Sequence, residues 1–595
     1  MNESYWTKTT RRRFLQGSGA GLTAAMLLAA CGGNDKSKDE ASSGLVSKAT
    51  DTTKQAKAGG IYKLALPTDT PRGFEPFLRD LPIAEHNYRA YETLLSIKSV
   101  PLAPIDDSVF EGSLGTSWEF SPDKLQLIFK IRPEPKWDQR PPTNGRALDS
   151  SDVEYTWKRY AATATLRADL ANAVSPDSPV VSVTTPDART AVFNLAFPTP
   201  DVLTTLAAGP AAGTFNIMPK ETESFDPRRE QRGTGPWYLS EYVPSARFAY
   251  TKNPLSWRKE FFVGGWELPI VPEYAQRLAQ FRVGNIYSFD IRPDDVVPTK
   301  HDVPDLNMVQ TDADGLTTRV IWGFREGPRS PFRDERMRQA YSMAIDRDLF
   351  IDTFGNVTKY RSQGLPVDVV WNNAAAALNA NTWWLNPQSK DFGPNAKYFE
   401  HNIAEAKKLI AAAGFPNGLD VDAAYIRTAE FGEDFPRRVE VALGMIADAG
   451  IRTKAQILDY TTELRPKYID ANGNFEGVAF RRAGGTGKAG LFGMYNSKGS
   501  QFNGFSPSGG TNFAGDPEYD TITAKIAKEF DIPTAKSLAF DLQRLEAKRQ
   551  YTPLFPGGAT GFSLAWPAVG NFGVYRGDFR RYWWLDDTKA PIKRA

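Results

Sequence analysis

Residues 331–347 read PFRDERMRQAYSMAIDR, and this stretch carries the clearest helix signal in the chain. Its apolar side chains recur at intervals of three and four residues and so share one face: Met337, Ala340, Tyr341, Ala344 and Ile345. We expect a helix from about Asp334 to Arg347 with that face in a core.

Strand signals and further helix signals alternate on both sides of this stretch. Residues 59–66 alternate so that both faces of a strand would be covered, and residues 125–131 read as a strand after the turn 121–123. Three further helices are predicted: 153–160 with a capping box of Ser151 and Glu154, 403–413 ending at Gly414, and 436–449 ending at Gly450. The pattern predicts an α/β chain with mixed sheets and no internal repeat.

Composition excludes two classes of function. The 595 residues include 72 basic and 70 acidic side chains, which gives no general electrostatic reason to bind nucleic acid. The three histidines are far apart in the sequence and there is one cysteine, so a zinc site is not expected. We predict no metal and no cofactor.

The first residues read as an export signal. Arg11 and Arg12 lie in a twin-arginine motif, and a short apolar run follows it and ends in Leu-Ala-Ala before Cys31. This ending resembles the lipobox of bacterial lipoproteins, which implies a signal peptide over residues 1–30 and a lipid on Cys31 that holds the protein to a membrane outside the cytoplasm. The polar residues 31–58 predict a flexible tether.

Several motifs occur in order along the rest of the chain. They are LGTSWEFSPD at 114–123, GTGPWY at 233–238, NPLSW at 253–257, PFRDERMRQA at 331–340, IDR at 345–347 and YTPL at 551–554. Together these segments resemble the family 5 extracytoplasmic solute-binding proteins, the receptors of ABC importers for peptides, nickel complexes and related solutes.

The resemblance implies a fold and a division of the chain. The fold is an α/β two-lobed periplasmic-binding-protein fold (type II, cluster C), in which two lobes close on a solute at a hinge. The implied first lobe is discontinuous and an extra domain is inserted into it. The expected bounds are 59–96, 232–318 and 553–595 for the first lobe, 97–231 for the inserted domain and 319–552 for the second lobe.

The resemblance also implies where a solute binds. Peptide-binding members place an aspartate in the second lobe, but here no Asp or Glu occurs between Glu476 and Asp516. Arg481, Arg482 and Lys488 lie in that stretch and favour a carboxylate or phosphate on an anionic or zwitterionic solute. A solvated loop of cations is an equal alternative.

Other binding candidates come from family position. Asn512 belongs to a matching G-x-N segment, and Trp322 and Phe324 lie in a strand-like stretch where the second lobe begins. Weaker candidates of the same kind are Met218, Trp237, Trp371 and Tyr495. Packing in a core is the alternative for each aromatic side chain.

The function implied is the substrate-binding component of an ABC importer. Its expected partners are a small solute, a permease with its ATPase, and the membrane through the lipid; we expect a monomer. The alternatives are a lipoprotein that senses the solute without transport, and an exported enzyme with a cofactor. Residues 484–488, GGTGK, lack the Ser or Thr that a phosphate-binding loop needs next, and no catalytic set is evident.

Overall fold

The computed structural model divides the chain into two units, Met1–Ser42 and Ser43–Ala595. The residues that it describes all lie in the second unit. They are 44–595 without 71–72, 79–80, 104, 107, 208–214, 314–316, 326–330, 378–382, 428–430, 433, 483–486, 500, 508–512, 577–578 and 594–595.

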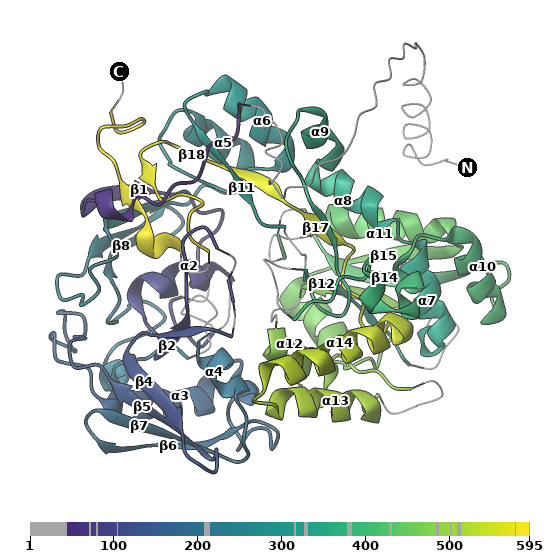
Figure 1. Cartoon of the computed structure of the whole chain (residues 1–595), viewed down its shortest axis with the longest axis horizontal. Helices are drawn as coiled ribbons and strands as arrows, with labels where there is room; N and C mark the ends of the chain where they lie inside the picture. Colours follow the sequence, from purple (N-terminus) through teal and green to yellow (C-terminus); the bar gives the residue numbers. More distant parts are fainter. Residues whose placement is uncertain are drawn as a thin grey trace, which may run out of the picture. The chain divides into compact units, whose positions relative to one another are not determined.

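Three four-stranded sheets organise this unit (Figure 1). The first sheet has the order β1 (Gly59–Lys63), β10 (Val263–Pro269), β9 (Arg247–Lys252), β8 (Trp237–Val243). The second sheet is antiparallel, in the order β4 (Gly115–Phe120), β5 (Gln126–Ile131), β7 (Thr190–Leu195), β6 (Val180–Asp187). The third sheet is mixed, in the order β12 (Thr318–Trp322), β16 (Val478–Arg482), β14 (Leu419–Ile426), β15 (Ile451–Leu458).

Short strand pairs and helices complete the unit. The pairs are β2 (Leu95–Ile97) with β3 (Phe110–Gly112), β11 (Asn307–Thr311) with β18 (Gly561–Ala565), β13 (Val369–Trp371) with β17 (Gly557–Ala559), and β19 (Val569–Gly570) with β20 (Trp584–Leu585). The helices are α2 (Leu81–Ala90), α3 (Ser150–Thr163), α4 (Asp201–Leu206), α5 (Tyr274–Arg282), α6 (Pro293–Asp302), α7 (Glu335–Ala344), α8 (Arg347–Gly355), α9 (Val357–Ser362), α10 (Ile403–Ala412), α11 (Phe435–Asp448), α12 (Gly487–Tyr495), α13 (Pro517–Lys528) and α14 (Ile532–Arg549).

The predicted strands at 59–66 and 125–131 are present as β1 and β5. The expectation that both faces of β1 are covered is wrong. Tyr62 is buried among aromatic rings, whereas Ile61 on the opposite face is 45% exposed. The strand therefore covers a core with one face only.

The helix near residue 153 begins earlier than predicted, and its cap is a different pair. Asp149 accepts from the backbone N–H of Ser151, and the Asp152 carboxylate accepts from the backbone N–H of Asp149. The predicted partner Glu154 instead accepts from Lys158. The capping box is shifted by two residues because the extended backbone at Asp149 exposes that N–H.

The helix predicted over 334–347 ends three residues early, and a second helix begins at Arg347. α7 ends at Ala344, and Asp346 caps α8 by accepting from the N–H of Leu349. Arg347 is buried, and its guanidinium donates to the Ser342 carbonyl at 3.0 Å. The IDR motif is thus a helix junction, in which the aspartate begins one helix and the arginine satisfies the end of the other.

The backbone of the GTGP motif lies very close to the end of α2. A Cβ on Gly233 would lie 1.6 Å from the Ala90 carbonyl oxygen, and Gly235 donates its N–H to that oxygen at 2.9 Å. Beside it, the buried carboxylate of Glu92 pairs with Arg258 at 2.7 Å and accepts from Thr234. These motif residues hold the fold together.

The end of the predicted tether is packed on the body, so that prediction is wrong for residues 44–58. Thr52 donates its N–H to Asn571 at 2.7 Å and its hydroxyl accepts from the indole of Trp584 at 2.9 Å. Leu45 and Val46 pack against a hydrophobic core. The polar side chains that suggested a tether make specific hydrogen bonds here. Residues 31–43 lie outside the described part.

The cores follow the sheets. One core covers the second sheet with residues from Phe77 to Met218, and another covers the third sheet with residues from Val320 to Phe555. A further core joins Ile351, Val357 and Tyr360 to segments around Val296 and Leu564. Residues 351–367 therefore share a core with segments that the predicted bounds give to the first lobe; the division into lobes stays a prediction.

Candidate functional site

Two stretches of chain enter and leave the third sheet side by side. One stretch runs from β11 into β12, and the other runs back beside β12 toward β17 and β18. These two stretches are called the crossings below. The N–H of Val320 donates to the Pro553 carbonyl at 3.0 Å, and the N–H of Phe555 donates to the Thr318 carbonyl at 2.7 Å. β11 and β18 are themselves paired. Both crossings are thus joined by backbone hydrogen bonds.

The strand register separates the candidate residues into two groups. In the antiparallel pair β12–β16, Trp322 lies opposite Val478, and Thr318 lies opposite Arg482. At about 3.3 Å per residue, the four-residue offset places Trp322 about 13 Å from the arginine end. The predicted aromatic and cationic residues are therefore not brought together, and the arginines lie at the end nearer the crossings.

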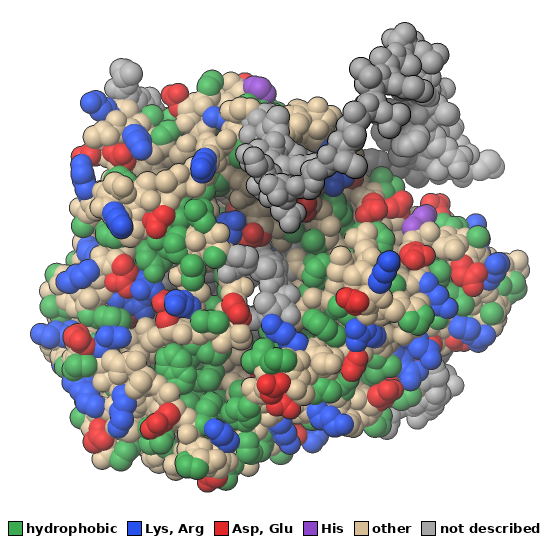
Figure 2. All heavy atoms as spheres, in the orientation of Figure 1, with side chains coloured by type: hydrophobic (Ala, Val, Ile, Leu, Met, Phe, Trp, Pro, Cys, Tyr) green, Lys and Arg blue, Asp and Glu red, His purple; other side chains and the backbone are tan. Residues whose placement is uncertain are grey.

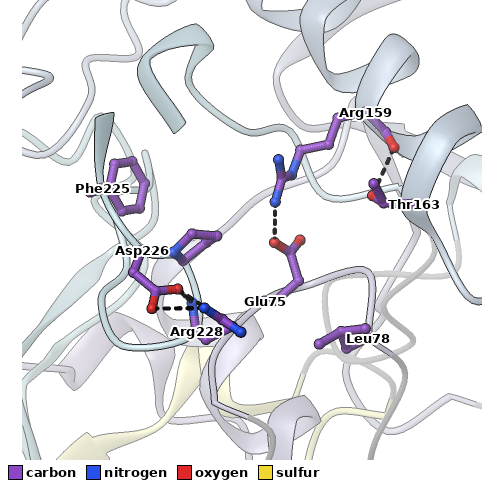
Figure 3. Close-up of a pocket in the computed structure, with 8 residues that line it drawn as sticks. Glu75, Leu78, Arg159, Thr163, Phe225, Asp226 and Arg228 are labelled. Carbon is purple, nitrogen blue, oxygen red and sulfur yellow. Dashed lines mark hydrogen bonds and ion pairs between the residues drawn. The ribbon is translucent and has the colours of Figure 1, made fainter. Parts of the chain in front are cut away.

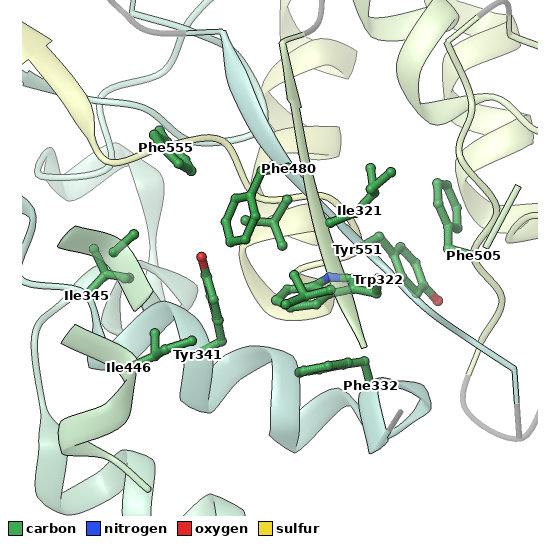
Figure 4. Close-up of a cluster of buried hydrophobic side chains, with 14 of the residues drawn as sticks. Ile321, Trp322, Phe332, Tyr341, Ile345, Ile446, Phe480, Phe505, Tyr551 and Phe555 are labelled. Carbon is green, nitrogen blue, oxygen red and sulfur yellow. The ribbon is translucent and has the colours of Figure 1, made fainter. Parts of the chain in front are cut away.

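Trp322 is packed inside the third-sheet core (Figure 4). Its ring stacks on Phe332 at 4.5 Å and meets Tyr341 edge-on at 4.9 Å. The indole N–H donates to the Gln550 carbonyl at 2.8 Å. With its ring packed and its donor satisfied, Trp322 has the core role that the sequence left open as the alternative.

Two other candidate side chains are also buried. Phe324 is 1% exposed and its N–H donates to the Gly473 carbonyl. Met218 is fully buried in the second-sheet core, and its N–H donates to the hydroxyl of Thr156. Each has the environment of a core residue in this structure.

The remaining candidates have mixed surroundings. Trp371 is half-buried in β13 and donates its indole N–H to Asp348 at 2.8 Å. Asn512 lies outside the described residues. A role for either in binding stays a prediction.

The cations of the predicted anion site lie in three different environments. Arg482 is exposed at the end of β16, and Arg481 is half-buried and donates to the Asn503 side chain at 3.2 Å. Lys488 is 4% exposed, pairs with Asp201 of α4 at 3.0 Å and donates to the Glu529 carbonyl. Lys488 is therefore already neutralised, and the expectation that it meets a solute anion is wrong.

Arg319 was missed by the sequence reasoning, and it lies opposite Arg481 in the strand pair. It is 1% exposed, and its Nε and Nη2 atoms have no hydrogen-bond partner among the residues that the structure describes. Burial, and the like charge of Arg481, lower its pKa to about 10. One feature of the sequence could have pointed to Arg319. It is a charged residue within the otherwise largely apolar stretch 318–322, and a strand in a core does not require a charge.

A cavity of about 510 Å³ lies away from these strands (Figure 3). Glu75 of its lining pairs with Arg159, and Asp226 pairs with Arg228 at 3.0 Å. Because the ion pairs lie within the lining itself, the cavity presents no excess of either charge.

Two further features concern metals and membranes. Among the residues that the structure describes, no three His, Cys, Asp or Glu side chains are grouped so that they could hold a metal ion. None of the described helices has the length and apolar content needed to cross a bilayer. On the face drawn in Figure 2, basic and acidic side chains are interspersed.

A family model matches residues 109–512, and its description is bacterial extracellular solute-binding proteins, family 5 middle. Among relatives, heme-binding protein A of Haemophilus influenzae is 22% identical over 517 residues, which are 83% of each chain. The dipeptide-binding protein DppE of Bacillus subtilis is 23% identical over 416 residues, 67% of this chain and 69% of that protein.

Solved structures share the fold at low identity. The periplasmic binding protein DppA from Helicobacter pylori, in complex with the peptide STSA, has a TM-score of 0.68 at 18% identity and covers 90% of this chain and 100% of its own. AgaA from A. tumefacien R10, in complex with agropinic acid, has a TM-score of 0.65 at 16% identity, covering 86% and 94%. These are type II periplasmic binding proteins with the predicted fold class.

Proposed function

Since the chain belongs to family 5 of the bacterial extracellular solute-binding proteins, we propose that it is the substrate-binding component of an ABC importer. It captures a small solute between two lobes and delivers it to a membrane permease driven by an ATPase. The observation that carries this proposal is the family match over 404 residues of the chain, counted as 512 − 109 + 1. We propose no enzymatic activity and no cofactor for this role.

The two paired crossings support a closing motion. Segments that pass side by side between separate cores concentrate any relative movement in a few residues, which is the behaviour of a hinge. Two contacts join the predicted inserted domain to the predicted second lobe. Asp201, the first residue of α4, pairs with Lys488 of α12 at 3.0 Å, and the Thr199 hydroxyl donates to the carbonyl of Ala527 in α13 at 2.6 Å. We propose that this interface forms when the lobes close.

The class of solute is suggested by relatives whose names or titles state what they bind, namely peptides, heme and agropinic acid. We propose a peptide-like or opine-like solute with an acidic group for this chain. The absence of Asp and Glu between Glu476 and Asp516 supports this, because nothing there would pair with the ammonium of a free peptide N-terminus.

Import is tested by deletion of the gene in its own host, followed by measurement of the solutes left in spent medium. We expect at least one peptide or acidic solute to stay in the medium after deletion and to be consumed again on complementation. Unchanged consumption of every solute, together with a changed transcriptional response to one of them, would instead favour the sensing alternative.

We also propose that Cys31 carries the lipid that keeps the protein at the membrane after export. Replacing Cys31 by Ser is expected to move the exported protein from the membrane fraction to the soluble fraction, because a stable anchor requires the thioether-linked chains. Immunoblots of the two fractions measure this, with Ser42→Ala as the control. Replacing Arg11 and Arg12 by Lys should leave the uncleaved precursor inside the cell. A C31S protein that stays in the membrane fraction would contradict the assignment.

A further inference from the structure

We propose that Arg319 and Arg481 form a site for an oxyanion, a carboxylate or phosphate group. This inference rests on the proposed function, because the oxyanion would be the acidic group of the solute. The residues that form it face each other across β12 and β16, at the end of the strands where the chain crosses into the third sheet.

Arg319 is a buried cation with two side-chain nitrogens that donate to none of the described residues. It is 1% exposed, and within the described part of the chain its Nε and Nη2 have no hydrogen-bond partner and its guanidinium makes no ion pair with a carboxylate. Its pKa of about 10 keeps the guanidinium charged near neutral pH. A buried charge without a partner is costly, so a native structure that retains one normally supplies a counter-ion.

Arg481 adds a second positive charge on the same side of the sheet. Residues directly opposite in an antiparallel pair have Cβ atoms about 5 Å apart, and like charges there are destabilising. Arg481 is held by its bond to Asn503, whose own amide donates to the Ile469 carbonyl at 3.3 Å. An anion between the two guanidinium groups would remove the repulsion.

The other groups around Arg319 do not supply that anion. The space next to it is lined by Asn503, Phe505 and Tyr551 among others, and in this structure it is too narrow to hold a water molecule. The carboxyl of Glu546 raises the pKa of Arg319 through its charge, but its oxygens accept from the Tyr519 hydroxyl and the Thr552 N–H, and burial raises its own pKa to about 7. The Tyr495 hydroxyl donates to the Ala374 carbonyl.

The position of the site links it to closure. Arg319 forms an isolated bridge with Leu554, so both crossings meet at this residue. An oxyanion bound here would contact the segments that move when the lobes close. Guanidinium groups prefer planar or tetrahedral oxyanions because they donate two parallel N–H bonds, so chloride is a poor substitute.

The test measures anion binding by the purified chain after it has been unfolded, dialysed and refolded to remove any solute. Isothermal calorimetry with phosphate and with citrate, at constant ionic strength in chloride, is compared for wild type, Arg319→Gln and Arg319→Lys. Arg452→Gln is the control, since it removes one exposed arginine from β15 of the same sheet.

We expect wild type and R452Q to bind phosphate or citrate, R319Q to bind at least 10-fold more weakly, and R319K to be intermediate. Equal binding by R319Q and wild type, or no binding beyond chloride by wild type, would overturn the site. If R319Q does not fold, a selenate soak of wild-type crystals decides, with an anomalous peak expected between the two guanidinium groups and its absence counting against the site.

Mass spectrometry of the molecule that copurifies with the protein separates the two proposals. A copurified solute with a carboxylate or phosphate supports both. A solute without an acidic group overturns the oxyanion assignment and leaves the receptor role intact. Phosphate binding without any solute or uptake defect supports a site for a free inorganic anion and overturns the importer role.

Discussion

Replacing Lys488 by Met is expected to lower the free energy of unfolding by about 3 kcal/mol at pH 7, because it leaves the Asp201 carboxylate buried without its cation. Lys488 is 4% exposed, and burial already raises the pKa of Asp201 to about 6 although Lys488 opposes the shift. Methionine keeps the apolar stem of the side chain, so the lost ammonium dominates the effect. The loss in free energy of unfolding is measured by urea-induced unfolding and by calorimetry.

The same interface provides a matched control. Lys498 pairs with Asp177 at 3.0 Å, but these side chains are 62% and 32% exposed. Lys498→Met should therefore cost less than about 1 kcal/mol. The double variant Asp201→Asn with Lys488→Met should recover most of the loss. Equal losses for K488M and K498M, or no recovery in the double variant, would contradict the explanation that the loss comes from a buried carboxylate left without its cation.

The pH dependence of K488M has a definite sign. Without Lys488 the pKa of Asp201 in the folded state rises further, while the unfolded value stays near 3.8. Protonation then favours the folded form, so the loss caused by the substitution should shrink as the pH falls from 7 to 5.

The second large effect expected is a loss of about 3 kcal/mol of stability through His86 as the pH falls from 7 to 4. His86 is 1% exposed in α2, and its Nδ1 lies 2.8 Å from the Tyr250 hydroxyl. Burial, and then the charge of Arg89, lower its pKa to about 3 from 6.5. Below pH 6.5 His86 is protonated in the unfolded chain but stays neutral in the folded chain until about pH 3. The contribution of His86 to the free energy of unfolding is therefore fully present above pH 6.5 and is lost as the pH falls toward 3.

Comparison of variants isolates this contribution. His86→Gln should flatten the decline of the unfolding free energy between pH 7 and 4, although it lowers stability at pH 7 by disturbing a packed site. His301→Gln changes an exposed histidine in α6 and should leave the slope unchanged. Other groups, such as Glu546 with its raised pKa, contribute equally to all three proteins. Identical slopes for H86Q and wild type would contradict the assignment.

The sequence predicted the fold better than the site, and the reason is physical. Helices with a periodic apolar face, such as α7 and α11, depend on local pattern and were found within a residue or two at their first turns. The second half of the stretch 331–347 was misread because Arg347 satisfies the end of α7 through the Ser342 carbonyl, a contact that apolar periodicity does not record.

The candidate site depends on register, which a single sequence does not contain. Trp322 and Arg481 were both predicted to bind the solute, yet the antiparallel pairing puts them at opposite ends of two strands. Lys488 looked free until α4 was found to bring Asp201 to it, from 287 residues away, counted as 488 − 201. Arg319 became a candidate only when its burial and its unused donors were known.

The most direct test of the central claim, that this protein is a solute receptor, is non-denaturing mass spectrometry of the protein isolated from the membranes of its own host. We predict one small molecule per chain, which is released when the protein is unfolded and whose mass is that of a peptide, an opine-like compound or another small acid. A spectrum containing the bare lipidated chain alone, from cells growing on a complete medium, would contradict the account.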